Sequence, residues 1–197
     1  MNPQSSPPMP KKPAPRSRPK IALPQPSSDP DARPVVLIDS REQTPLNVAK
    51  YLPTLTASLY SGDYSILGME HDFAIERKTI ADLTSSLVGS NRERFEHELL
   101  RLRGMRFKRL LIVGDPIEIE EHRYRSRISP GSVFGSLATY EARFDLPTVW
   151  EPCPDKAARL VARWAFYFQK EQVRIWQKVK TCHIDHAASP SVLQLAN

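Results

Sequence analysis

Residues 62–82 read GDYSILGMEHDFAIERKTIAD, and this stretch is the basis for interpreting the rest of the chain. Two carboxylates, Asp63 and Glu76, lie 13 residues apart, and Lys78 follows Glu76 by two positions. Residues two apart on a strand point to the same face, so Glu76 and Lys78 are predicted to lie side by side while Arg77 points to the other face. Two carboxylates and a lysine in this arrangement are what a metal-dependent phosphodiester-cleaving site needs.

The chemistry explains why these residue types belong together. A divalent metal polarises a phosphoryl oxygen and lowers the pKa of a bound water, and Mg²⁺ binds through one or two carboxylates. Asp63 and Glu76 can supply these carboxylates, while the Lys78 ammonium can stabilise charge developing on phosphorus. Simpler interpretations also exist. Asp63 can be a turn residue, and Glu76 and Lys78 can be an exposed pair on an edge strand.

The segments around this stretch alternate between strand and helix patterns. Strands are predicted over residues 35–38, 55–60, 72–78, 110–113 and 147–150, and helices over residues 46–52, over residues 91–105, from Ser129 and from Asp155. This alternation predicts an α/β fold, a mixed central β-sheet flanked by helices. Chemistry in such open sheets gathers at strand ends, which is where Asp39, Asp63 and Glu76 are predicted to lie.

Several motifs together resemble a known family. They are Asp39-Ser40-Arg41-Glu42, Gly62-Asp63-Tyr64, Glu76-Arg77-Lys78 and Asp82. These motifs resemble the nuclease domain of the XPF-type structure-specific endonucleases, part of the PD-(D/E)XK nuclease superfamily. The resemblance covers roughly residues 35–169 and implies a restriction-endonuclease-like core. Many members carry a tandem helix-hairpin-helix module after the nuclease. Only 17 residues follow Lys180, so a form without this module is expected.

The resemblance also implies roles for the site residues. Asp63 and Glu76 are expected to bind Mg²⁺, with Mn²⁺ as an alternative, and Arg77 to lend its backbone carbonyl. Lys78 is the expected catalytic lysine. The other positions implied in catalysis are Asp39, as a nearby acidic residue supporting the metal site, and the motif residues Arg77 and Asp82. Asp82 has an equally good structural interpretation, because three residues after Thr79 it can cap a helix.

The charge distribution fits a polyanionic partner. The net charge is +6, and residues 1–34 hold six Lys or Arg against two Asp. Basic clusters at residues 92–109 and 122–127 are candidates for phosphate contacts, and Tyr124 can stack on an unpaired base. The predicted DNA contacts are Arg41, Arg92, Arg94, Arg123, Tyr124 and Arg125. Each of these basic groups also has a simpler interpretation. The N-terminal segment can be a solubilising tail, the cluster at residues 92–109 can be a solvated helix face, and Arg41 can form a loop ion pair with Glu42.

Composition predicts three regions. Residues 1–33 read as a disordered, basic, Pro-rich arm, residues 34–180 as the nuclease domain and residues 181–197 as a flexible tail. Cys153 and Cys182 are too few for a disulfide framework. No apolar run approaches the roughly 20 residues of a membrane span. A cytoplasmic location is expected, nucleoid-associated in a bacterium or nuclear in a eukaryote.

Together these patterns predict a Mg²⁺-dependent endodeoxyribonuclease that hydrolyses phosphodiester bonds of branched or junction DNA. Two alternatives remain open: a catalytically silent DNA-binding scaffold and a nuclease subunit that needs a partner. A homodimer is predicted through the apolar face of the last helix, which includes Trp164 and Phe168.

Overall fold

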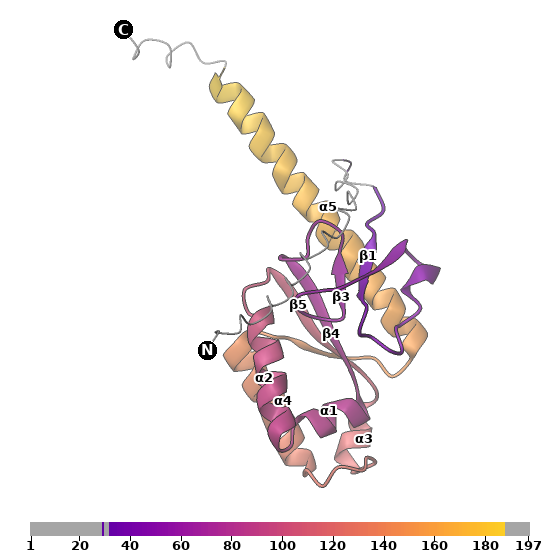
Figure 1. Cartoon of the computed structure of the whole chain (residues 1–197). Helices are drawn as coiled ribbons and strands as arrows, with labels where there is room; N and C mark the ends of the chain where they lie inside the picture. Colours follow the sequence, from indigo (N-terminus) through magenta and orange to yellow (C-terminus); the bar gives the residue numbers. More distant parts are fainter. Residues whose placement is uncertain (1–28, 30–31, 188–197) are drawn as a thin grey trace, which may run out of the picture.

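A single six-stranded sheet forms the centre of the molecule in the computed structural model, which describes Asp29 and residues 32–187 (Figure 1). Its strand order is β2-β1-β3-β4-β5-β6. The strands are β1 Val36–Asp39, β2 Thr54–Ala57, β3 Tyr64–Ile66, β4 Phe73–Thr79, β5 Phe107–Val113 and β6 Thr148–Trp150. Strand β3 is antiparallel to β1 and β4, and the other neighbours are parallel. The predicted mixed sheet is confirmed.

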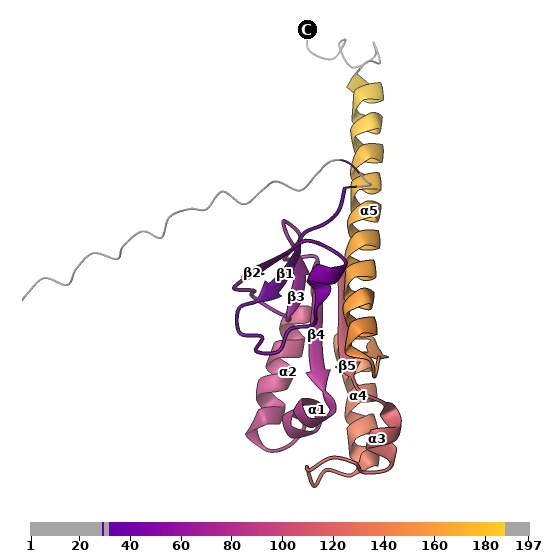
Figure 2. The same ribbon diagram turned by 90° about the vertical axis from the view of Figure 1, so that its right-hand side faces the viewer.

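Helices cover both faces of this sheet. They are the 3-10 helix η1 Val48–Lys50 and the α-helices α1 Ile80–Ser86, α2 Ser90–Leu102, α3 Pro116–Glu120, α4 Pro130–Phe144 and α5 Pro154–Ala187. Helices α2 and α5 lie on opposite sides of the sheet (Figure 2). Within the described residues, none of the helices combines the length and apolar character that crossing a bilayer requires.

Strand β4 alternates between two hydrophobic cores. Ala74 packs into the core that includes α1, α2 and α4, while Phe73 and Ile75 pack into the core that includes α5. Because side chains alternate along a strand, Glu76 and Lys78 continue the row of Ala74 and face the α2 side. The burial of both faces explains the consecutive apolar residues at 73–75 in β4 and at 110–113 in β5.

Two short elements were not predicted from the sequence. Strand β3 has only three residues, which is too short to display an alternating pattern. Helix α3 begins with a capping box in which the Asp115 side chain accepts from the Ile117 N–H and Glu118 accepts from the Asp115 N–H. The sequence predicted a strand over residues 110–113 and no helix between it and Ser129, because Gly, Asp and Pro also favour turns.

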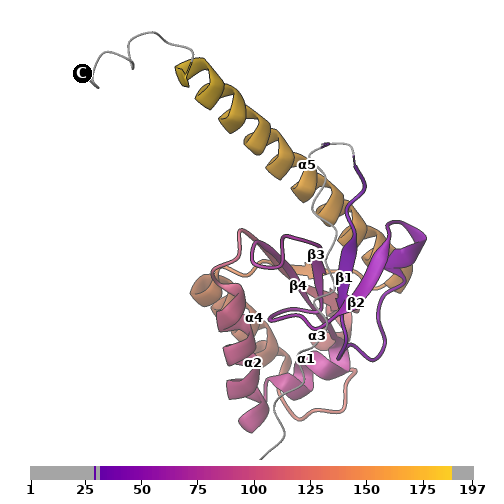
Figure 3. The same ribbon diagram turned by 45° about the horizontal axis from the view of Figure 1, so that its top comes forward.

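The last helix is longer than predicted. Helix α5 continues past Lys180 to Ala187, so it enters the segment that was expected to be a flexible tail. Its C-terminal part projects beyond the sheet and the other helices (Figure 3). Most of the predicted arm over residues 1–33 and the end of the predicted tail lie outside the described residues.

Two glycines allow a matched test of packing. A Cβ atom at Gly114, which follows β5, meets the side chain of Ile80 at the start of α1, whereas one at Gly135 within α4 meets nothing within 4 Å. We expect Gly114→Ala to lower the free energy of unfolding by about 1–3 kcal/mol through overpacking. Gly135→Ala should raise it by about 0.5–1 kcal/mol, because alanine favours a helix interior. Urea unfolding measures both, and shifts in the same direction contradict this packing.

Candidate active site

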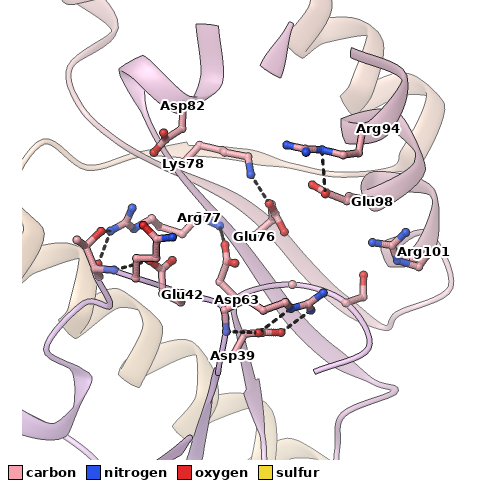
Figure 4. A pocket seen from close by; sticks show the side chains of 15 residues that line it. Asp39, Glu42, Asp63, Glu76, Arg77, Lys78, Asp82, Arg94, Glu98 and Arg101 are labelled. Atoms are coloured by element: carbon pink, nitrogen blue, oxygen red, sulfur yellow. Dashed lines mark hydrogen bonds and ion pairs between the residues drawn. The ribbon is translucent and has the colours of Figure 1, made fainter. Parts of the chain in front are cut away.

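A pocket opens at one end of the interior strands, where β1 and β4 end and β3 begins (Figure 4). The antiparallel pairing of β3 with both neighbours brings these three strand ends together. The pocket contains most of the residues predicted for the site: Asp39, Arg41, Asp63, Glu76, Arg77, Lys78, Asp82 and Arg94.

Glu76 and Lys78 form an ion pair on one face of β4, as the sequence predicted. The Lys78 Nζ donates to Glu76 Oε1 at 2.7 Å, and the Glu76 residue is only 5% exposed. The ammonium also lies 5.0 Å from the centre of the Phe95 ring on α2. The pair is therefore buried between β4 and α2 and is not an exposed pair on an edge strand, since β4 has neighbours on both sides.

Asp63 approaches the pair through a turn that requires glycine. Gly62 has a φ of 76°, and a Cβ atom there would lie 3.1 Å from both the Ala74 Cβ and the Ile75 carbonyl oxygen. The Asp63 N–H donates to this Ile75 oxygen at 2.8 Å. The Asp63 Oδ2 accepts from the Arg77 N–H at 2.7 Å. Both bonds fix the Asp63 backbone and carboxylate against β4.

Burial raises the proton affinity of both carboxylates, and the charge of Glu76 raises that of Asp63 further. Burial, and then the charge of Glu76, raise the pKa of Asp63 to about 8, although Arg77 and Lys78 oppose the shift. Burial also raises the pKa of Glu76, although Lys78 lowers it. Burial lowers the pKa of Lys78, but the Glu76 carboxylate outweighs this effect, so the pKa is raised. Lys78 is therefore an ammonium donor at neutral pH.

The donor set fits a hard divalent cation. The buried Glu76 carboxylate and the partly buried Asp63 carboxylate lie close together, and one lysine supplies the neighbouring positive charge, so a cation would relieve the excess negative charge. The Ser61 hydroxyl also lines the pocket and is buried without a hydrogen-bond partner among the described residues. Within those residues, no three His, Cys, Asp or Glu side chains form a metal cluster. Mg²⁺ accepts such a site because water and substrate oxygens complete its shell.

Asp39 is committed to a different partner. Its carboxylate accepts from the N–H, Nε and Nη2 of Arg41 at 2.6–2.9 Å and from the Leu59 N–H at 3.2 Å. Burial raises the pKa of Asp39, but these bonds and the Arg41 charge outweigh it and lower the pKa. The alternative of an Arg41–Glu42 ion pair is wrong, because Arg41 pairs with Asp39. Asp39 therefore holds Arg41 at the rim of the pocket.

Arg77 and Asp82 line the pocket with side chains that have structural partners. The Arg77 Nη2 donates to the Thr44 carbonyl oxygen at 2.5 Å, and its side chain points away from Lys78, as predicted. The contribution of its backbone carbonyl to a metal stays a prediction. Asp82 accepts from the Thr79 hydroxyl at 2.6 Å and donates its N–H to the same oxygen at 3.2 Å. The helix-capping interpretation of Asp82 is confirmed.

Two pocket residues on α2 were missing from the predicted site. Glu98 raises the pKa of Glu76, whereas Arg101 lowers it. With Arg94, whose Nε lies 4.0 Å from Glu98 Oε1, they form one side of the pocket. The three residues recur at positions i, i+4 and i+7, so they share one helix face. Helical spacing relative to the buried Phe95 could have identified them.

The remaining predicted DNA contacts lie outside the pocket lining. Arg92 donates to Glu96 and Ser136 at 3.1 Å, which ties α2 to α4. The Tyr124 ring stacks on His122 at 4.4 Å, and its hydroxyl donates to the Ile128 carbonyl oxygen at 2.8 Å. One ring face of Tyr124 is thus already occupied. Arg123 pairs with Glu121 at 2.8 Å, and Arg125 is exposed. Their contact with DNA stays a prediction.

Comparisons with known proteins agree with this geometry. A family model described as the ERCC4 domain matches residues 38–163. Among solved structures, XPF from Aeropyrum pernix aligns with a TM-score of 0.57 and 22% identity, covering 73% of this chain and 70% of that chain. The structure of XPF from Aeropyrum pernix in complex with DNA aligns with a TM-score of 0.57 and 23% identity, covering 71% and 66% respectively. A comparison with curated proteins gives no match. The predicted resemblance and the fold class are confirmed.

The raised pKa of Asp63 predicts a pH-dependent cost in stability. Its folded pKa of about 8 exceeds the ordinary value of 3.8 for an aspartate, so its stabilising contribution is present at low pH and is lost as the pH rises from about 4 to about 8. We expect metal-free Asp63→Asn to melt several degrees above the unsubstituted protein at pH 8, with a smaller gap at pH 5. Mg²⁺ should raise the melting temperature of the unsubstituted protein only.

Differential scanning fluorimetry across this pH range, with EDTA or Mg²⁺, measures both effects. Asp72→Asn makes the same change outside the pocket lining and is the control. A gap that does not depend on pH would show that Asp63 ionises as in water.

Proposed function

Because the chain belongs to the ERCC4 domain family, we propose that it is a divalent-metal-dependent endodeoxyribonuclease that hydrolyses phosphodiester bonds of branched or junction DNA. The observation that carries the proposal is the buried Glu76–Lys78 pair on β4 with Asp63 beside it in one pocket. The comparison with XPF from Aeropyrum pernix, which was solved in complex with DNA, supports DNA as the substrate class.

The residues of the pocket have different roles in the proposed reaction. A bound Mg²⁺ or Mn²⁺ would supply an activated water and polarise the scissile phosphate. Asp63 and Glu76 would hold the cation with their carboxylates. Lys78, kept protonated by Glu76, donates a hydrogen bond to the phosphate and stabilises the negative charge that develops there. The role of Lys78 is therefore that of a cationic donor.

The rim of the pocket supplies further positive charge for the substrate. The Arg41 side chain is 69% exposed. Charge-assisted hydrogen bonds to Asp39 fix the orientation of its guanidinium. They involve this one arginine, so the rim as a whole is not neutralised. On the facing helix, Arg94 and Arg101 line the same pocket, with Glu98 between them. These arginines are suited to contact the phosphates next to the scissile bond.

A cleavage assay tests the proposal. Purified protein is incubated with labelled flaps, forks and plain duplex in Mg²⁺, Mn²⁺ or EDTA. We expect cleavage that requires the metal and favours branched substrates. Glu76→Gln and Lys78→Ala should each reduce the rate at least about 100-fold, because each removes charge aimed at the reacting phosphate.

Glu120→Gln is the matched control for Glu76→Gln, because Glu120 is exposed on α3 outside the pocket lining. Undiminished cleavage by either pocket variant would falsify the assignment of the site. Binding of DNA without cleavage under every metal condition would favour a silent scaffold or a nuclease that requires a partner.

The same proposal includes a homodimer through α5. Trp164 and Phe168 are partly buried, with ring centres 6.1 Å and 5.7 Å from that of Phe107. Farther along the same side of the helix, Ile175 is 38% exposed and Val179 is 50% exposed. This apolar edge runs from beside the sheet onto the projecting part of α5, where a second copy can cover it.

A substitution on the projecting part tests this interface without disturbing the core. We expect a mass of twice 22.4 kDa by light scattering, and a shift toward monomer for Val179→Glu. Thr181→Glu introduces the same side chain on roughly the opposite side of α5 and should stay dimeric. A monomeric mass for the unsubstituted protein at working concentration rules out the dimer.

A further inference from the structure

Helix α5 carries a regular row of basic side chains. The row, called the α5 stripe, consists of Lys156, Arg159, Arg163, Lys170, Arg174 and Lys178. Consecutive members are three, four, seven, four and four residues apart. At about 100° per residue, this spacing places all of them within a band of about 100° around the helix. The stripe therefore forms one continuous face.

This face points away from the sheet. The opposite side of α5 is buried against the sheet through alanines such as Ala158, Ala162 and Ala165. All members of the stripe are exposed except Lys170, which is partly buried with its ammonium 5.8 Å from the Phe166 ring centre. Between the ends of the stripe, the only carboxylate on the helix is Glu171, at the edge of the band.

The stripe differs from an ordinary solvated helix face. Helix α2 mixes signs, with Arg92 paired to Glu96 and Arg94 near Glu98. By contrast, among the described residues none of Lys156, Arg159, Arg163, Arg174 and Lys178 forms a salt bridge within 4.0 Å. Like charges that are close together on one helix repel each other. A polyanionic ligand would remove this repulsion.

The length and the neighbours of the stripe indicate which polyanion it fits. From its first to its last member it spans about 33 Å at 1.5 Å per residue, close to one turn of duplex DNA. Tyr167 lies within the band and is 62% exposed. A row of cations with an exposed aromatic ring matches a nucleic-acid strand, in which phosphates alternate with bases that stack.

We propose that the α5 stripe is a second nucleic-acid contact, which binds the phosphate backbone of a DNA segment outside the pocket. Helices α2 and α5 lie on opposite sides of the sheet, so the stripe and the pocket rim face different directions (Figure 2). The stripe therefore contacts a different stretch of DNA from the one that is cut. DNA as the ligand rests on the proposed function, whereas binding is measurable without cleavage.

Charge reversal on the stripe tests this proposal directly. Anisotropy of labelled single-stranded and duplex DNA, in EDTA and between about 50 and 200 mM salt, gives the dissociation constant. Arg163→Glu with Arg174→Glu should weaken binding at least about tenfold and reduce the slope of log K against log salt by about 2, because two phosphate contacts are lost. The charge-matched control is Arg143→Glu with Lys180→Glu, exposed cations outside the stripe, the pocket lining and the basic clusters at residues 92–109 and 122–127, which should change affinity less than about twofold.

Further measurements distinguish the possible outcomes. Binding is measured in EDTA, where no metal-dependent cleavage occurs, whereas the active-site variants are scored by cleavage in Mg²⁺, so failure of the active site and failure of the stripe are distinguishable. Tyr167→Ala should weaken binding of single strands more than of duplex if bases stack there, and equally if only the backbone is bound. Equal losses in the stripe and control variants, or binding of the stripe to phosphatidylserine vesicles but not to DNA, would overturn the proposal.

Discussion

The burial of β4 on both faces is the constraint on which the rest of the site depends. Because the strand lies between two cores, the direction of every side chain is fixed by alternation. Ile75 must enter the α5 core, so Glu76 must face α2. A shift of register by one residue would place Glu76 among the apolar side chains of the α5 side, where a carboxylate has no partner. The hydrophobic pattern of β4 therefore positions the chemistry.

This placement makes the site electrostatically unfavourable without a ligand. Glu76 is buried with Lys78 as its partner, whereas Asp63 is compensated mainly by a backbone N–H and by the more distant lysine. Partly compensated buried charges cost stability, and they persist where a function requires them. The Gly62 turn adds a second requirement, because any Cβ there would press on β4. Both features are expected where a fold holds acidic groups ready for a cation.

Residues of the site could be predicted from the sequence where local geometry alone relates them. Glu76 and Lys78 could be predicted because strand alternation alone relates them, and Asp63 because its turn has a distinctive sequence. Glu98 lies on α2, and its position depends on how Phe95 rotates that helix into the core. Strand β3 was missed because three residues carry no periodic signal. Sequence patterns thus predicted what local geometry determines, and tertiary packing determined the rest.

Charged side chains are arranged differently on the two sides of the sheet, and the difference follows from how deeply they are buried. On the α2 side, opposite charges are packed closely in a pocket, where low solvent exposure strengthens each interaction. On the outer face of α5, basic side chains lie in water, where the electrostatic interaction of each one is weak and is screened by salt. The first arrangement suits a reaction at one phosphate. The second suits a long polyanion, because many weak contacts sum along its length while none fixes its sequence. The layered α/β fold keeps the two arrangements on separate surfaces.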